Sequence, residues 1–218
     1  MELKAISNNQ MRQNIYVYFC PLSKEGVIID PGHNIEELIK YVNVNEIKIA
    51  KILLTHGHFD HIHFAKEASA AFNAQIHCHA DEAEMLKSPE LNLSSYISRQ
   101  KVSLSPDGLL NEGDEIGFGG CTLKVLHTPG HTPGCICFYD ETNAVVFTGD
   151  TLFFESVGRT DLPKSSTTGI INNIKEKLFT LPTHVKVYPG HGAATSIGHE
   201  TVNNEIVNEF YDGTAATG

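Results

Sequence analysis

Four side chains that can bind a metal ion lie within six residues of one another: His56, His58, Asp60 and His61. They directly follow the apolar run at 49–54, which predicts a buried strand. A loop at the carboxyl end of such a strand aims its side chains into a crevice. The spacing differs from the HExxH pattern, in which two histidines share one helix face. We therefore expect a metal site built on a loop.

Three further candidate ligands lie farther along the chain, each beside a glycine at the end of an expected strand. They are His131, Asp150 and His191. Glycine allows the backbone to approach a bound ion or ligand closely. Imidazole and carboxylate groups suit zinc, iron or manganese, and a set of five histidines and two aspartates is too large for one tetrahedral ion. The set predicts two divalent metal ions, zinc first and iron or manganese as alternatives, that share a carboxylate, hold a hydroxide and hydrolyse an ester-like bond.

Two strand-rich stretches must position these residues, and helices flank both. The expected strands span 3–7, 15–20, 25–29, 49–54, 75–79, 115–118, 121–126, 135–139, 144–148 and 184–188. The expected helices span 34–42, 62–72, 81–87, 167–179 and 198–210, and residues 88–111 follow no regular pattern. Helices on the outer faces of two packed sheets would satisfy the layer rule for domains. We assign residues 1–211 to a single domain and 212–218 to a frayed tail.

The composition narrows the classes of partner. Sixteen Lys and Arg against twenty-six Asp and Glu give a formal net charge of -10, which argues against a nucleic-acid partner. No apolar stretch is long enough to span a bilayer, so we expect no membrane partner. The first residues are polar, and the five cysteines are widely spread. This pattern is typical of reduced thiols and predicts a cytoplasmic location.

The motifs together resemble the metallo-β-lactamase-fold hydrolases, and more closely their glyoxalase II-like (hydroxyacylglutathione hydrolase-like) branch. The resemblance extends over residues 30–204 and rests on the segments Thr55–His61, His127–Gly134, Phe147–Leu152, Gly158–Asp161 and Pro189–Gly192. It implies an α+β fold, a four-layer αββα sandwich with the metal ions between the sheet edges. It also implies a small-molecule thioester substrate such as an acylglutathione.

The resemblance also assigns roles to individual residues. It implies that His56, His58 and His131 hold one metal ion and that Asp60, His61 and His191 hold the other. Asp150 would bridge the two ions, and Asp60 would also accept a proton during catalysis. Asp30 would support the metal-binding loop from behind, and Arg159 would anchor a carboxylate of the substrate.

A second function is compatible with the same residues. Persulfide dioxygenases also resemble this chain and share its Gly158–Asp161 segment. They bind a single iron through two histidines and one aspartate, which would correspond to His56, His131 and Asp150. We rank this oxidoreductase below the hydrolase. His63 lies just beyond the first motif, and we expect it to have a surface or packing role. The sequence does not specify the oligomeric state.

Overall fold

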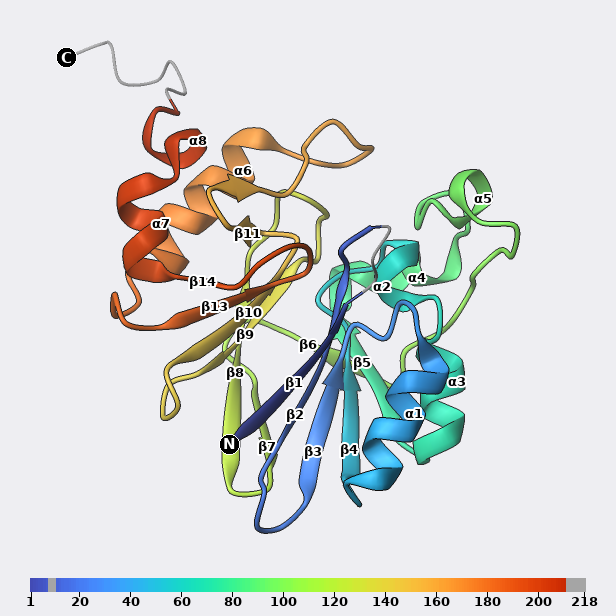
Figure 1. The fold of residues 1–218 in the computed structure, drawn as a ribbon. Coiled ribbons are helices and arrows are strands. Elements are labelled where there is room, and N and C mark those ends of the chain that lie inside the picture. Colours follow the sequence, from blue (N-terminus) through green and yellow to red (C-terminus); the bar gives the residue numbers. More distant parts are fainter. Residues whose placement is uncertain (8–10, 211–218) are drawn as a thin grey trace, which may run out of the picture.

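The computed structural model describes residues 1–7 and 11–210 and arranges them around two six-stranded sheets (Figure 1). The first sheet has the order β1-β2-β3-β4-β5-β6 and the second has the order β14-β13-β10-β9-β8-β7. The strands of the first sheet are β1 (Glu2–Ser7), β2 (Asn14–Phe19), β3 (Glu25–Ile29), β4 (Lys48–Leu53), β5 (Gln75–His79) and β6 (Gly108–Leu110). Those of the second are β7 (Glu115–Phe118), β8 (Cys121–His127), β9 (Ile136–Asp140), β10 (Val145–Gly149), β13 (Lys186–Pro189) and β14 (Thr195–Ser196). A hairpin of β11 (Leu152–Phe153) and β12 (Ser156–Val157) follows β10.

Helices cover the outer face of each sheet. Side chains of α1 (Ile35–Val44) and α3 (Ala65–Phe72) join one core cluster with the first sheet. Side chains of α6 (Thr167–Asn173), α7 (Ile197–Asn203) and α8 (Glu205–Asn208) join another with the second sheet. Figure 1 shows α1 and α3 on one side of the paired sheets and α6, α7 and α8 on the other. The predicted four-layer αββα sandwich is confirmed.

The alternation along β2 explains why the first sheet is covered on both faces. Tyr16 and Tyr18 point into the core between the sheets, whereas Ile15 and Val17 belong to the core beneath the helices. All four side chains are buried, as expected for a strand with apolar neighbours on both sides. Phe147 of the second sheet fills the space between the sheets, with its ring centroid 5.2 Å from that of Tyr16.

Most expected elements lie within one or two residues of their observed bounds, but the helix expected at 62–72 is interrupted. A short helix, α2 (Phe59–Ile62), begins inside the histidine motif, and α3 begins only at Ala65. The break occurs because the Phe64 N–H bonds to the Pro31 carbonyl at 3.0 Å instead of continuing the α2 ladder. Asp60 and His61 therefore lie on a single helical turn.

Two other regions differ from the expectation. Residues 88–111 contain α5 (Ser94–Ile97) and β6, and β6 forms the edge of the first sheet by pairing in parallel with β5. The helix expected at 198–210 divides into α7 and α8 at Asn204, whose side chain accepts the N–H of Val207. The extent of the domain, 1–211, stays a prediction, and the expected tail, 212–218, lies outside the described residues.

Candidate metal centre

Strand ends from both sheets deliver the seven predicted ligands to one place. The segment 56–61 follows β4 of the first sheet, whereas His131, Asp150 and His191 follow β8, β10 and β13 of the second. Glycines allow the two sides to approach closely. A Cβ atom on Gly190 would lie only 2.2 Å from Asp150 Oδ1 and 2.8 Å from His61 Cε1. Only glycine at position 190 leaves room for these side chains.

The candidate ligands form two clusters. Ligand atoms of His56, His58 and His131 lie within 4.8 Å of one another, and so do those of Asp60, His61 and His191. Asp150 lies between the clusters, as its distances show. Its Oδ1 is 3.3 Å from His61 Nε2, and its Oδ2 is 3.6 Å from both His131 Nε2 and His191 Nε2. This arrangement is consistent with a dinuclear metal site to which Asp150 would contribute a ligand from between the two clusters.

Backbone carbonyls orient two of the imidazoles. His131 Nδ1 lies 2.8 Å from the Arg159 carbonyl oxygen, and His191 Nδ1 lies 2.9 Å from that of Met11. A carbonyl only accepts hydrogen bonds, so each Nδ1 carries the proton. With the proton of the neutral imidazole held on Nδ1, the Nε2 atom of each ring is the one that can present a lone pair to the centre, as metal binding requires.

Asp30 orients two further ligands from behind. Its Oδ2 lies 2.9 Å from His61 Nδ1 and accepts the Thr55 hydroxyl at 2.6 Å, while its Oδ1 accepts the Thr55 N–H at 2.8 Å. The Thr55 hydroxyl donates to Asp30, so it accepts from His56 Nδ1 at 3.1 Å. One buried carboxylate thus directs Nε2 of His61 and, through Thr55, Nε2 of His56 toward the centre. Asp30 was identified from the sequence as a supporting residue, but the Thr55 hydroxyl was not identified as the link between Asp30 and His56.

The chemistry of the donor set fits divalent transition metal ions. His56 Nε2 and Asp150 Oδ1 are buried and have no hydrogen-bond partner within the described part of the chain. A buried polar atom without a partner is costly, and a coordinated cation would remove that cost. Five imidazoles and two carboxylates without thiolate match zinc, iron or manganese.

The pKa shifts place most donors in their binding forms. Burial lowers the pKa of His56 well below its usual range and that of His58 to about 3, so both rings are neutral. Burial alone would raise the pKa of Asp150, but His61 and His191 hold it well below the usual range. Burial alone would lower the pKa of His61, yet Asp150, Asp60 and Asp30 raise it well above the usual range. His61 must therefore release a proton when an ion binds.

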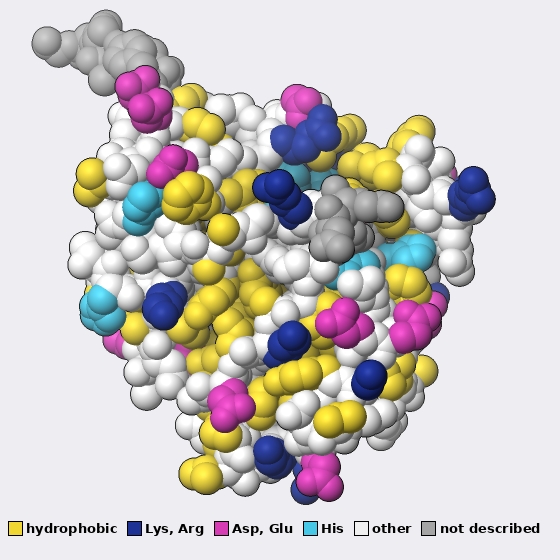
Figure 2. Space-filling view, viewed as in Figure 1, with side chains coloured by type: hydrophobic (Ala, Val, Ile, Leu, Met, Phe, Trp, Pro, Cys, Tyr) yellow, Lys and Arg dark blue, Asp and Glu magenta, His cyan; other side chains and the backbone are white. Residues whose placement is uncertain are grey.

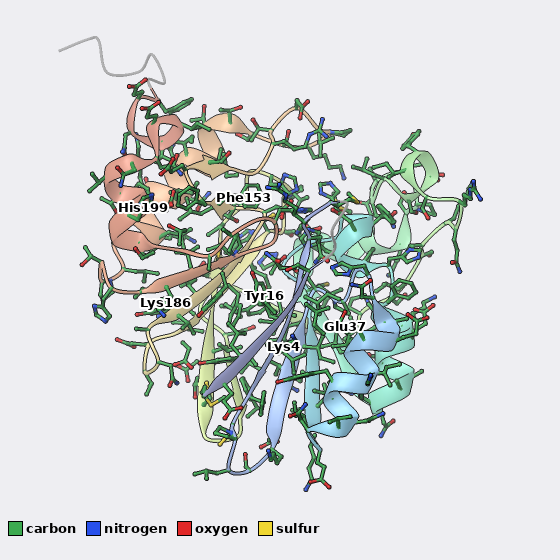
Figure 3. The ribbon with its side chains drawn as sticks, in the orientation of Figure 1. Lys4, Tyr16, Glu37, Phe153, Lys186 and His199 are labelled. Carbon is green, nitrogen blue, oxygen red and sulfur yellow. The ribbon has the colours of Figure 1, made fainter. Side chains whose placement is uncertain are left out.

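A cleft of about 340 Å³ opens over the centre. His58, Asp60, His131, Asp150 and His191 contribute polar atoms to it. The apolar side chains that line it are Met11, Leu93, Ile97, Phe153, Val157 and Leu162. Phe153, labelled in Figure 3, comes from the β11–β12 hairpin. The centre is thus open to a small molecule with a substantial apolar part.

Arg159 lines the same cleft, but its guanidinium is bound to a neighbour. It donates to Asp161 through two hydrogen bonds of 2.7 and 2.9 Å, and 63% of the side chain is exposed. Its role as a substrate anchor stays a prediction, while its carbonyl orients His131 as described above. His63 contributes to neither cluster and packs edge-on against Phe59 and Phe64.

The chain belongs to the metallo-β-lactamase superfamily, because residues 9–191 match the family described as "Metallo-beta-lactamase superfamily". A probable metallo-hydrolase from Bacillus subtilis is 35% identical over 194 residues, with 88% of this chain and 92% of the relative covered. The hydroxyacylglutathione hydrolase GloC from Haemophilus influenzae is 34% identical over 187 residues, with 85% and 88% covered. The predicted family membership is confirmed.

Two solved structures share the fold at similar identity. One is BLEG-1, described as a B3 metallo-β-lactamase, at 36% identity and a TM-score of 0.89, with 94% of this chain and 99% of that chain covered. The other is TTHA1623 in a di-iron-bound form, at 32% identity and a TM-score of 0.81, with 92% and 98% covered. Together with the site geometry, these similarities identify a metallo-hydrolase with a histidine-rich metal site.

Two further observations concern the surface and the helices. On the face shown in Figure 2, lysine and arginine side chains lie among acidic, apolar and uncharged ones. Within residues 1–7 and 11–210, no helix has the length and apolar character needed to cross a membrane.

Proposed function

We propose that this protein hydrolyses a small-molecule thioester, with an acylglutathione as the first candidate, and that it uses two divalent metal ions. Zinc is our first assignment, and iron or manganese are the alternatives. The observation that carries this proposal is that both ligand clusters contribute residues to one open, partly apolar cleft, which Asp150 also lines. The five free cysteines lead us to place the reaction in the cytoplasm.

Different residues of the site would bind the substrate, hold the metal ions and accept a proton. When bound, two such ions supply an activated water and polarise the acyl carbonyl. The apolar wall of Leu93, Ile97 and Phe153 excludes water from an acyl or thiol portion laid against it. Burial raises the pKa of Asp60, but His61 and His191 outweigh this effect and lower it, so Asp60 is ionised and can accept a proton. The products are a carboxylic acid and a free thiol.

The named relatives support this choice without deciding the substrate. GloC, whose name specifies hydroxyacylglutathione hydrolysis, shares 34% of its aligned residues with this chain. BLEG-1 is named as a β-lactamase, so β-lactams belong among the substrates to test. The 34% identity to GloC leads us to place thioester hydrolysis ahead of persulfide oxidation by a one-iron dioxygenase, so glutathione persulfide belongs in the same substrate panel.

The test is steady-state turnover of zinc-, iron- and manganese-loaded protein on a fixed panel. The panel contains lactoylglutathione, an acyl-coenzyme A, a chromogenic cephalosporin and, in an oxygen electrode, glutathione persulfide. We expect thiol release from at least one thioester to exceed all other activities. The His58→Ala variant should lose it, whereas His184→Ala, outside both clusters, should retain it. Full activity in His58→Ala, or oxygen consumption as the dominant activity, would overturn the proposal.

A further inference from the structure

A buried carboxylate outside the ligand set lies between two of the ligand loops. Glu82 ends the short 3-10 helix Ala80–Glu82, and its side chain has no exposed surface. Its Oε2 accepts the N–H of Gly57 at 2.9 Å, and its Oε1 accepts the N–H of Gly134 at 2.7 Å. The Thr132 hydroxyl donates to the same Oε1. Burial raises the pKa of this carboxyl to about 7, and the three donors oppose that shift.

The donors belong to the two loops that form the first cluster. Gly57 lies between His56 and His58, and Thr132 directly follows His131. The two loops are separated by more than 70 residues in sequence, since His58 and His131 lie 73 positions apart. Glu82 therefore connects, through hydrogen bonds, two loops that are far apart in the sequence.

The surrounding backbone is shaped to admit this carboxylate. A Cβ atom on Gly57 would lie 2.8 Å from Glu82 Oε2, and one on Gly134 would lie 2.6 Å from Glu82 Cγ. Real Cβ atoms essentially never approach other heavy atoms so closely. Glycine at both positions is consistent with a requirement for direct contact between the loops and Glu82.

We propose that Glu82 is a positioning residue of the metal centre, which holds the loops of His56, His58 and His131 at the separation required to bind one ion. The inference rests on the proposed metal centre and not on the choice of substrate. Within the described residues, the hydrogen bonds of the Glu82 side chain go to this side of the site, so its effect is confined to the cluster of His56, His58 and His131. The cluster of Asp60, His61 and His191 has its own supports in Asp30 and the Met11 carbonyl.

The decisive variant is Glu82→Gln. The amide oxygen can replace Oε1, but the amide N–H₂ then faces the Gly57 N–H, and two donors cannot bond to each other. The matched control is Glu84→Gln, two positions away, where the carboxylate is 78% exposed and pairs only loosely with Lys164. Competitive titration with a chelator counts the tightly bound zinc ions and gives their affinities. The absorption spectrum of the cobalt-loaded protein reports the geometry of each site.

We expect Glu82→Gln to retain one tight ion and to bind the other about 10- to 100-fold more weakly, the usual effect of losing an outer partner of a metal ligand. Glu84→Gln should match the wild type. Equal weakening of both ions would indicate a general structural role and would overturn the proposal, as would wild-type affinity for both. If Glu82→Gln does not fold, the same measurements are made on Thr132→Val, which removes the hydroxyl that donates to Glu82. Thr132→Ser keeps this hydroxyl and should restore the wild-type affinities. A wild-type protein that binds two ions without thioester turnover would refute the proposed function alone.

Discussion

Replacing Asp30 by Asn tests how the chain prepares its imidazoles for a metal ion. Asp30 has φ +52°, a left-handed conformation that Asn tolerates, so the backbone can stay in place. The amide oxygen can accept the Thr55 N–H as Oδ1 does now. The amide N–H₂ then occupies the place of Oδ2, which lies 2.9 Å from His61 Nδ1. A donor at this position favours a His61 ring with its proton on Nε2, the atom needed by the ion.

The magnitude follows from this change of tautomer. Losing such a partner weakens metal affinity by roughly 10- to 100-fold, which corresponds to about 1.4 to 2.7 kcal/mol of binding free energy. The metal-free protein loses hydrogen bonds to a charged acceptor and gains weaker neutral ones. We therefore expect its free energy of unfolding to fall by about 1 to 2 kcal/mol. The protein should still fold, with a defect concentrated in metal binding.

The assay is a competition titration of metal-free protein with zinc and a chromophoric chelator, together with urea unfolding of the same samples. Asp114→Asn is the matched control, because Asp114 Oδ2 is an exposed acceptor in the turn before β7. Two tight ions in Asp30→Asn, with affinities within about twofold of the control, would refute the role of Asp30 in orienting the ligands.

Three further predictions concern the pH dependence of metal affinity and the effects of substituting Gly190 and Arg159. Burial lowers the pKa of His61 and His191, but neighbouring carboxylates outweigh it and raise both. Ion binding should therefore release at least one proton, and metal affinity should rise with pH through the usual titration range of histidine and above it, by up to about tenfold per pH unit for each proton released. Calorimetry in buffers of different ionisation enthalpy counts these protons, and zero would contradict the assignment. Gly190→Ala should lower the metal content measured by elemental analysis, whereas Gly117→Ala, which has nothing within 4 Å of its Cβ, should not. Arg159→Ala should cost less than about 1 kcal/mol of stability because its ion pair is exposed. It should raise KM for an acylglutathione at nearly unchanged kcat, and an unchanged KM would remove Arg159 from substrate contact.

The local parts of the site could be predicted from the sequence because their signals are local. The segment 56–61 carries four candidate ligands after one apolar run, and His191 follows a strand and a glycine. Glu82 had no such signal, since its partners lie 25 to 52 positions away and the folded chain alone brings them together. Asp30 was identified through the family resemblance and not through any spacing.

The elements of the fold also differ in whether their own residues or contacts with distant residues determine them. Strands such as β2 and β8 were predicted from their apolar pattern alone. β6 has only three residues, and its pairing with β5 places it in the sheet. The break at Phe64 has an equally distant cause, since its N–H bonds to Pro31 instead of the preceding turn. Tertiary hydrogen bonds of this kind leave no mark on hydrophobic periodicity.

The distribution of ligands over both sheets has a consequence for the order of events during biosynthesis. His61 and His191 lie 130 positions apart, so the second cluster is complete only after β13 has joined the second sheet. In small zinc domains the ion and the fold form together, because the unfolded chain holds no preformed site. Here every residue up to His191 must be synthesised before the two ligand clusters of the proposed centre can both be complete. The ions of the proposed centre would then be selected by the geometry and ligand types of a finished fold, together with the metal supply around it.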